Sequence, residues 1–350
     1  MIQDHISGIA DEIALQPAAV QATVSLLRQG ATIPFIARYR KEATGNLDEV
    51  AITAIRDRLS RLEELDARKA TVLKSLETHG HLTDELKQKV ISAADMASLE
   101  DIYLPYRPKR RTKAMIAREK GLEPLALKIL EQSEQDPLQL AAEFLDPEKD
   151  VVSTDDALEG ARHIIAEIIN EDPAAREKMR DLYFAKGIIQ TRLISGKEAE
   201  GAKYKDYFDW QEPAARAPSH RILAMRRGEK ETVLNLRIAP PEQDALALLE
   251  TLFVKGDTAA SMQVHLAVRD CYKRLLSHSM ETEIRLATKQ RAENMAIEVF
   301  ARNLRQLLLT PPLGPKRVMG IDPGFRTGCK LVCLDRQGKL LHHDTIYPHM

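Results

Sequence analysis

The chain has 350 residues, of which 44% are apolar and 29% charged, as in a folded globular protein of two or three domains. Its formal net charge of −1 points to no class of partner, so any charged binding surface must be local. The first residues, MIQDHISGIADEIA, lack the basic segment of a secretory signal, and no window approaches about 18 uninterrupted apolar residues. We therefore expect a cytoplasmic protein that does not contact a membrane.

Residues 1–186 are expected to form a helical N-terminal region. Apolar residues recur there at helical spacing, and Pro17 and Gly30 punctuate the first two helices. Thr83 is a candidate N-cap, and Ser98 begins a capping-box spacing. The predicted helices cover residues 2–15, 18–29, 47–79, 84–94, 122–135, 137–145, 155–170 and 173–186.

Residues 187–240 show a different pattern. The segments IIQTRLISG and TVLNLRIAP are rich in β-branched or alternating apolar residues and predict two strands. The stretch between them is polar and is broken by Pro213 and Pro218. We expect a small mixed α/β insertion here.

Helices return over residues 241–314. The longest predicted helix covers 279–309, and Glu281 and Glu283 would suit its first turn, because acids complement the positive end of a helix dipole. The prolines at 311, 312 and 315 then stop the helix. This is the clearest domain boundary in the sequence.

Positive charge is concentrated in LPYRPKRRTKAMIAREKG, residues 104–121. Residues 105–120 hold seven bases and one acid, whereas residues 121–160 hold eleven acids and two bases. Lysine and arginine at this density neutralise phosphates and release counterions, which favours nucleic-acid binding. The alternative is a solvated loop that balances the acidic helices. The candidate nucleic-acid ligands are Arg107, Lys109, Arg110, Arg111 and Lys113.

A second candidate surface is IPFIARYRKEATGNLDE, residues 33–49. Arg38, Arg40 and Lys41 interleave with Phe35 and Tyr39, as in surfaces that combine phosphate contact with base stacking. The same pattern is typical of a packed corner between helices, with the aromatic rings and Ile36 in the core.

A third candidate is GAKYKDYFDW, residues 201–210. Four aromatic residues fall within seven positions, next to Lys203 and Lys205. Stacking platforms for bases have this composition. So does the hydrophobic nucleus of a small domain.

The segment VMGIDPGFRTGCKLVCLD, residues 318–335, predicts a strand that ends at Asp322, a turn and a returning strand. With LLHHDTIY it would form a three-stranded meander. Three interpretations are open. Asp322 could begin an RNase H-like Mg²⁺ site, it could begin an actin-like ATPase, or it could only cap a hairpin turn.

The cysteines of this segment are interpreted as structural. Cys329 and Cys333 would face one side of the second strand. With Cys271 they are few and odd in number, which favours reduced core thiols over disulfides or a metal site.

Several long motifs resemble the Tex family of bacterial transcription accessory proteins: IPFIARYRKEATGNLDE, LEDIYLPYRPKRRTKAMIAREKGLEPLA, SGKEAEGAKYKDYF, SMETEIR, AIEVFARNLRQLLL and MGIDPGFRTGCK. The resemblance implies a helical N-terminal region with a helix-turn-helix-like element, then an RNase H-like domain of the YqgF type from about residue 317. In the family, helix-hairpin-helix elements and an OB-fold RNA-binding domain follow. The chain would therefore end inside the RNase H-like domain, and we expect residues 317–350 to be poorly ordered or to dock on the preceding helices.

The sequence thus predicts a mainly α fold with four parts: 1–186, 187–240, 241–314 and 317–350. We expect a non-enzymatic chain that binds RNA more readily than DNA, acts with the transcription machinery, and carries no metal or cofactor. Mg²⁺ would matter only in a complete RNase H-like domain.

Two rival functions stay open. One is a Mg²⁺-dependent nuclease using Asp322, which Asp344 could approach and Asp335 could not. The other is a protein-interaction scaffold. The sequence does not indicate an oligomeric state.

Overall fold

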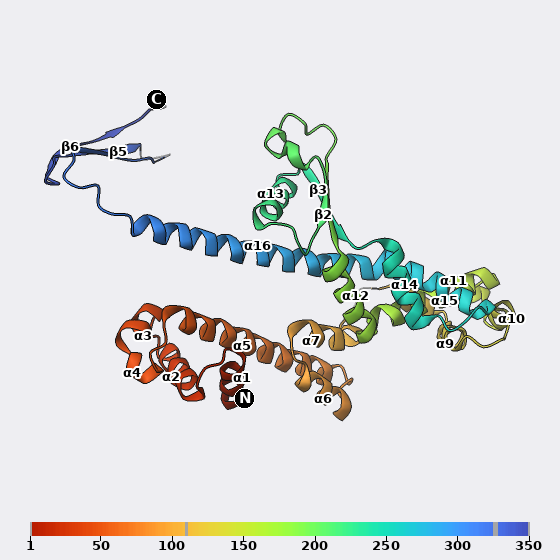
Figure 1. The fold of residues 1–350 in the computed structure, drawn as a ribbon. Helices are drawn as coiled ribbons and strands as arrows, with labels where there is room; N and C mark the ends of the chain where they lie inside the picture. The colour runs from red at the N-terminus through yellow and green to blue at the C-terminus, as the bar shows by residue number, and fades with distance from the viewer. Residues whose placement is uncertain (1, 109–110, 325–327, 349–350) are drawn as a thin grey trace.

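The computed structural model describes residues 2–108, 111–324 and 328–348 of the chain. The fold is mainly α with two small antiparallel sheets, as predicted. Figure 1 shows a helical N-terminal region below the long helix α16, helices packed around one end of α16, and a small sheet beyond its other end. Among the described residues, no helix combines the length and the apolarity needed to span a bilayer.

The N-terminal helices pack on the two halves of α5. The first half of α5 buries Ile52 and Ile55 against α1, α2 and α3, and its second half buries Val72 and Leu76 against α6 and α7. Asp48 caps α5 by accepting a 2.8 Å hydrogen bond from the Ala51 amide. The elements are α1 (Ile2–Glu12), α2 (Pro17–Arg28), α3 (Ile33–Tyr39), α4 (Lys41–Thr44), α5 (Glu49–Thr78), α6 (Asp84–Ser92) and α7 (Met96–Tyr103).

The predicted cap of α7 at Ser98 is wrong. Asp95 occupies the cap position, and its carboxylate accepts a 2.8 Å hydrogen bond from the Ser98 amide. This bond lowers the pKa of Asp95. Thr83, by contrast, caps α6 as predicted.

The largest core is built around α11. Ile164, Ile165 and Ile169 are fully buried, and Ser153 and Asp156 form a capping box at the start of the helix. The elements around this core are α8 (Lys113–Glu119), α9 (Glu123–Glu131), α10 (Pro137–Ala142), α11 (Thr154–Glu171), α12 (Pro173–Lys186), α14 (Glu242–Phe253) and α15 (Ala259–Cys271).

The first sheet has the strand order β2-β1-β3, with both pairings antiparallel. The two predicted strands are β1 (Ile188–Leu193) and β3 (Leu234–Ala239). Sequence reasoning missed β2 (Asp209–Pro213) and the helix α13 (Ser219–Lys230) between them. The outer edge of β3 is closed by α16, because the Ile238 amide donates to Glu281 and Arg285 donates to the Leu236 carbonyl.

Helix α16 (Ser277–Leu308) does not begin where the sequence suggested. A π-helical segment, η4 (Tyr272–Leu276), joins α15 to α16 without a break. Glu281 and Glu283 are therefore not in a first turn, and they bind arginine side chains instead. Segments of this kind often mark functional sites in long helices.

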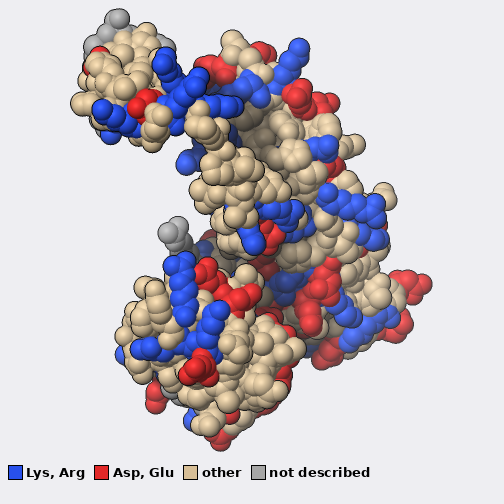
Figure 2. Space-filling model, turned by 60° about the vertical axis from the view of Figure 1, so that its left-hand side comes forward, with Lys and Arg blue, Asp and Glu red and all other residues tan. Residues whose placement is uncertain are grey.

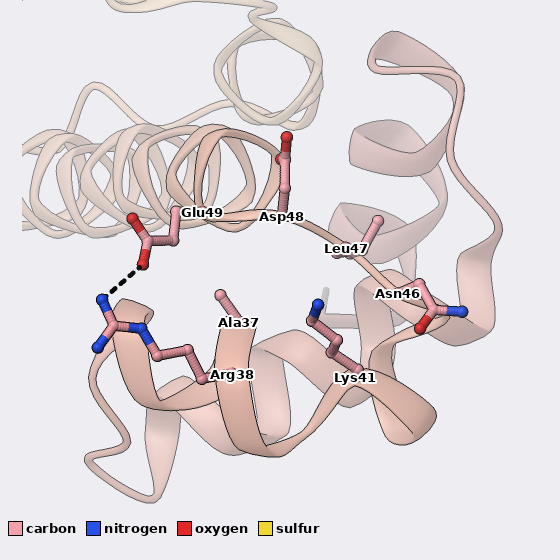
Figure 3. Close-up of a pocket in the computed structure, with 7 residues that line it drawn as sticks. All are labelled: Ala37, Arg38, Lys41, Asn46, Leu47, Asp48 and Glu49. Carbon is pink, nitrogen blue, oxygen red and sulfur yellow. Dashed lines mark ion pairs between the residues drawn. The ribbon is translucent and has the colours of Figure 1, made fainter. Parts of the chain in front are cut away.

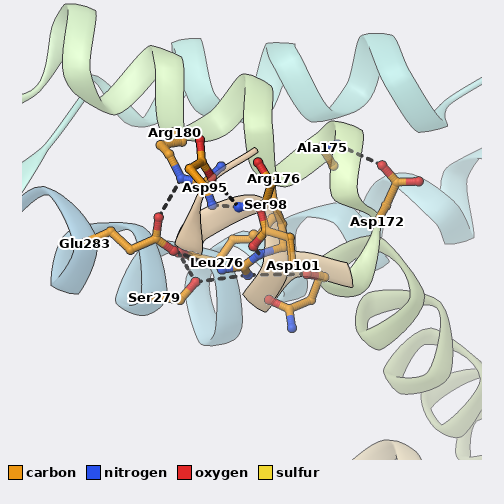
Figure 4. Close-up of polar contacts among 11 residues, drawn as sticks. Asp95, Ser98, Asp101, Asp172, Ala175, Arg176, Arg180, Leu276, Ser279 and Glu283 are labelled. Carbon is orange, nitrogen blue, oxygen red and sulfur yellow. Dashed lines mark hydrogen bonds and ion pairs between the residues drawn. The ribbon is translucent and has the colours of Figure 1, made fainter. Parts of the chain in front are cut away.

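Four buried or half-buried charges join α7, α12 and α16 (Figure 4). Arg176 binds Asp101 at 2.5 Å and Glu283 at 3.0 Å, while Arg180 binds each of the same two carboxylates at 2.7 Å. The side chains of Asp101 and Arg176 are only 6% and 7% exposed. This cluster fixes the N-terminal helices to the central ones.

The second sheet is the predicted meander. It consists of β4 (Val318–Asp322), β5 (Cys329–Leu334) and β6 (Leu340–Ile346) in that order. Apolar side chains such as Met319 and Leu341 are exposed, as expected for strands without a covering layer. Docking on the preceding helices, one of the two expected outcomes, is not seen, because the sheet lies apart from the helical body in Figure 1.

We predict that Arg176→Ala destabilises the chain by about 3 kcal/mol, because removing one member of a buried ion-pair cluster leaves its partners uncompensated. The measurement is the shift of the urea-unfolding transition. Arg28→Ala is the control: it breaks an exposed pair with Glu63 and should cost less than about 1 kcal/mol. Equal shifts for the two variants would contradict the structural role of the cluster.

Candidate nucleic-acid interface

The basic turn lies between α7 and α8. The 3-10 helix η1 (Leu104–Tyr106) follows α7, and Thr112 caps α8 by accepting a 3.1 Å hydrogen bond from the Met115 amide. Arg107, Arg111 and Lys113 are exposed. Arg111 pairs with Glu119 at 2.7 Å. The other two candidates of this turn, Lys109 and Arg110, lie outside the described residues.

Arg107 and Lys113 line one pocket of about 300 Å³. Within the described part of the chain, neither has an ion-pair partner. Arg274 of η4 and His163 of α11 line the same pocket, so it collects basic groups from three distant segments. Sequence reasoning missed Arg274 and His163, because no local pattern links them to the turn.

Two charged groups of this pocket are held by other side chains. Glu167 accepts hydrogen bonds from Arg118 at 2.5 Å and Thr112 at 3.1 Å, and Arg274 binds Asp270, outside the pocket, through two of its nitrogens. The hydrogen bonds and charge of Arg274 lower the pKa of Asp270 although burial raises it. Arg107 and Lys113 are therefore the basic groups left available to a ligand.

Burial, followed by the positive charge of Lys113, lowers the pKa of His163. Both effects favour the neutral ring. A neutral imidazole offers one donor and one acceptor to a ligand in the pocket without adding charge.

The second surface surrounds a shallow pocket of about 360 Å³ between α3 and the start of α5 (Figure 3). Arg38 and Lys41 line this pocket, and Arg38 lies 3.8 Å from Glu49. Lys41 is exposed and, among the described residues, has no ion-pair partner.

The aromatic residues of this surface are not in the core. Ile36 is fully buried, but Phe35 and Tyr39 are 39% and 68% exposed, so the packed-corner interpretation is right only for Ile36. The two rings lie 5.6 Å apart, and the Arg40 guanidinium lies 5.0 Å from the Phe35 ring centre. The surface thus presents aromatic rings and cations together.

The third stretch behaves mainly as a hydrophobic nucleus. Tyr204 is buried with Val233 and Leu234 under the 3-10 helix η3 (Ala202–Tyr207). Lys203 pairs with Glu231 at 2.7 Å, whereas Lys205 is exposed. The nucleus interpretation therefore fits the aromatic residues better than a stacking platform does.

The structure does not bring the three basic stretches together. Figure 1 places α3 and α4, the segment after α7, and the segment before β2 at three separate parts of the molecule. In Figure 2, Lys and Arg are interspersed with Asp and Glu over most of the visible face. A nucleic acid that contacted all three basic stretches would have to extend from one to the next.

Asp322 ends β4 and lies opposite Lys330 of β5. Asp344 lies opposite Leu331, one residue out of that row, so its side chain projects from the other face of the sheet. The expectation that Asp344 could approach Asp322 is therefore wrong. No group of three or more metal-ligating side chains is present in the described parts of the chain.

Cys329 and Cys333 share one face of β5, as predicted, and both are free thiols. They are half-exposed rather than in a core. Cys271 is buried in α15, and burial raises the pKa of its thiol.

Together, these features define a mainly helical protein with a small inserted sheet, several separate basic surfaces and a terminal meander. Three models of one family match the chain in order: the Tex-like protein N-terminal domain over residues 3–77, the Tex central region-like domain over 132–300, and the Tex protein YqgF-like domain over 316–350. The chain belongs to the Tex family.

Curated relatives match along almost the whole chain. It is 42% identical to the protein tex of Bordetella pertussis over 99% of this chain and 46% of the relative. It is 40% identical to the transcriptional accessory protein Tex of Neisseria gonorrhoeae over 97% of this chain and 46% of the relative. The human S1 RNA-binding domain-containing protein 1 is 27% identical over 99% of this chain and 36% of the relative. The chain spans about half the length of the bacterial relatives.

We predict that His163 titrates with a pKa below its ordinary value of 6.5, and that Lys113→Ala moves this pKa part of the way back. Burial continues to favour the neutral ring in the variant, but the repulsion from Lys113 is gone. NMR titration of the ring protons measures both pKa values. Lys74→Ala, which removes an exposed lysine of α5, is the control and should leave the midpoint unchanged. An unchanged midpoint in Lys113→Ala would contradict the geometry of the pocket.

Proposed function

We propose that this chain contacts nucleic acid, RNA in preference to DNA and without sequence specificity, as part of a transcription accessory factor. The observation that carries the proposal is the pocket at the basic turn, where Arg107 and Lys113 are exposed and available. Lys109, Arg110 and Arg111 lie between them in sequence, so five bases fall within seven residues. The names of the relatives, which refer to transcription and to RNA binding, agree with the proposal.

The binding is electrostatic in this proposal. The basic turn neutralises phosphates first, and Arg38, Arg40 and Lys41 add a second contact beside Phe35 and Tyr39, whose exposed rings can stack on unpaired bases. Lys205 supports a third and weaker contact. Lys203 contributes less, because it is already paired with Glu231.

The proposed parts of the chain are those expected from the sequence: 1–186 with the helix-turn-helix-like element, 187–240, 241–314 and 317–350. We propose that the chain has no catalytic role of its own. A two-metal nuclease needs several carboxylates on one side of the sheet, and Asp322 and Asp344 project from opposite faces.

A second candidate function is docking on the transcription machinery. The C-terminal half of α16 exposes Ile297, Phe300, Leu304 and Leu307 at helical spacing, and three of these four are more than half exposed. The test is binding of purified RNA polymerase after nuclease treatment. Phe300→Asp/Leu304→Asp should abolish an interaction made by this stripe, and polymerase binding that is lost with the nucleic acid would contradict it.

We predict that Arg107→Ala/Arg111→Ala/Lys113→Ala weakens binding to a single-stranded RNA about tenfold at low salt. The slope of log K against log salt should fall by about 2, because each phosphate contact on a single strand contributes about 0.7. Fluorescence anisotropy at several salt concentrations measures both quantities.

The matched control is Lys74→Ala/Lys87→Ala/Lys178→Ala, which removes the same charge from three exposed positions elsewhere. It should leave the affinity within about twofold, since exposed lysines away from the phosphates add only long-range attraction. Equal losses in the two triple variants would refute the role of the turn.

A further inference from the structure

The open face of the sheet β2-β1-β3 carries a set of exposed polar side chains. Along β1, Ile189 and Thr191 are buried, while Gln190 and Arg192 are exposed. Along β3, Leu236 and Ile238 are buried, and Asn235 and Arg237 are exposed in the same alternation. The exposed side chains of the two strands therefore share one face.

The strand register sets two arginines diagonally across this face. Arg237 lies opposite Gln190, and Arg192 lies opposite Asn235, so the two arginines occupy neighbouring rows on adjacent strands. Such diagonal neighbours are about 7–8 Å apart. Gln211 of β2 continues the row of Gln190 and adds a third amide side chain to the face.

The two guanidinium groups are available to a ligand. In the described part of the chain, neither Arg192 nor Arg237 has an ion-pair or hydrogen-bond partner, although Asp209 lies opposite Arg192 in the register. Glu281 is the acid that lines the adjoining pocket, and it is held by the Ile238 amide and by Arg285. Exposed arginines that form no ion pair are suited to phosphate.

A pocket of about 470 Å³ lies where this face meets α16. Its lining residues include the two arginines, Gln190, Asn235 and His278. Guanidinium groups can bind phosphates, and the amides of Gln190 and Asn235 offer donors and acceptors to the edges of unpaired bases. The combination is matched to a nucleotide unit rather than to an apolar molecule.

The location of the pocket favours a polymer over a free anion. Arg274 and Leu275 of η4 line the pocket of the basic turn, while Ser277, His278 and Glu281 of α16 line the pocket of the sheet. Arg274 and His278 are four residues apart on one continuous helical run, a rise of about 6 Å. One strand leaving the turn would reach the sheet within a few nucleotides.

We propose that the open face of β2-β1-β3 is a further nucleic-acid contact, which binds single-stranded RNA through Arg192 and Arg237 and continues the path from the basic turn. The inference rests on the proposed function, because the ligand is the same polymer. It adds a separate site with separate residues.

The test is RNA binding by the whole chain, with a labelled uridine oligonucleotide of about 12 nucleotides and several salt concentrations. In Arg192→Ala/Arg237→Ala we expect about fivefold weaker binding at low salt and a salt slope lower by about 1.4, from two lost phosphate contacts. The matched control is Arg216→Ala/Arg227→Ala, two exposed arginines of the same region that do not lie on the sheet face. It should stay within about twofold of the parent chain, since those positions make no proposed phosphate contact.

Gln211→Lys is a test in which the expected result is tighter binding, and misfolding would not produce that result. It adds a positive charge to the row of Gln190 and Arg237, so it should tighten RNA binding and increase the salt slope by about 0.7. Unchanged or weaker binding in this variant would count against the sheet face.

The outcomes separate the two proposals. Equal binding by the Arg192/Arg237 variant and its control overturns the sheet-face site, while loss of binding in the turn variant still supports the proposed function. Loss in the sheet variant together with full binding by the turn variant supports the sheet face and refutes the turn. A parent chain that does not bind the oligonucleotide at low salt overturns both.

Discussion

The ion-pair cluster of Asp101, Arg176, Arg180 and Glu283 is the contact on which the arrangement of this chain depends. Each arginine binds both carboxylates, so α7, α12 and α16 are fixed by one network rather than by independent pairs. Buried charges of this kind are tolerated only when every member has its partners. Asp101 lies six residues before Arg107 in the chain, and Glu283 lies on the same helical run as Arg274. The cluster therefore also sets how the basic turn meets the π-helical segment.

Arginine has two different uses in this structure, and the difference lies in the partner. Arg118, Arg176 and Arg285 bind acids on other segments and hold the helices and the sheet edge in place. Arg107, Arg192 and Arg237 are exposed and, in the described ranges, have no acidic partner. The net charge, which is near zero, does not reveal these two uses of arginine, because most paired bases are offset locally by the acids that bind them. The candidate binding surfaces therefore depend on the bases that are not used in structural ion pairs.

Local sequence patterns predicted most helices and strands, but they did not predict which of these elements pack together. The strong periodicity of 155–170 and 173–186, and the β-branched runs of β1 and β3, are properties of single segments. The start of α16 was wrong because the π-helical segment continues α15, and the helix-start signal of Glu281 and Glu283 came from residues that bind distant arginines. Strand β2, DWQEP, carries little β-propensity and forms through its pairing with β1. Arg274 and His163 could not be assigned to the basic turn, since only the packing of α11 and η4 brings them there.

Helix α16 connects the helical body to the terminal meander, and its two halves differ in their packing. Its first turns are covered: Glu281 and Arg285 close the edge of β3, Glu283 anchors α12, and Arg291 donates to the backbone carbonyls of Ala214 and Ala215. Beyond Ala292 no residue of the helix is buried, and the helix carries the meander away from the body (Figure 1). A rigid helix with one half fixed and one half bare holds two surfaces of different chemistry at a constant separation. The fixed half lies beside the sheet face whose cations and amides are suited to phosphates and bases, whereas the bare half presents an apolar stripe suited to protein. In the proposed function, nucleic acid and a protein partner therefore use different residues.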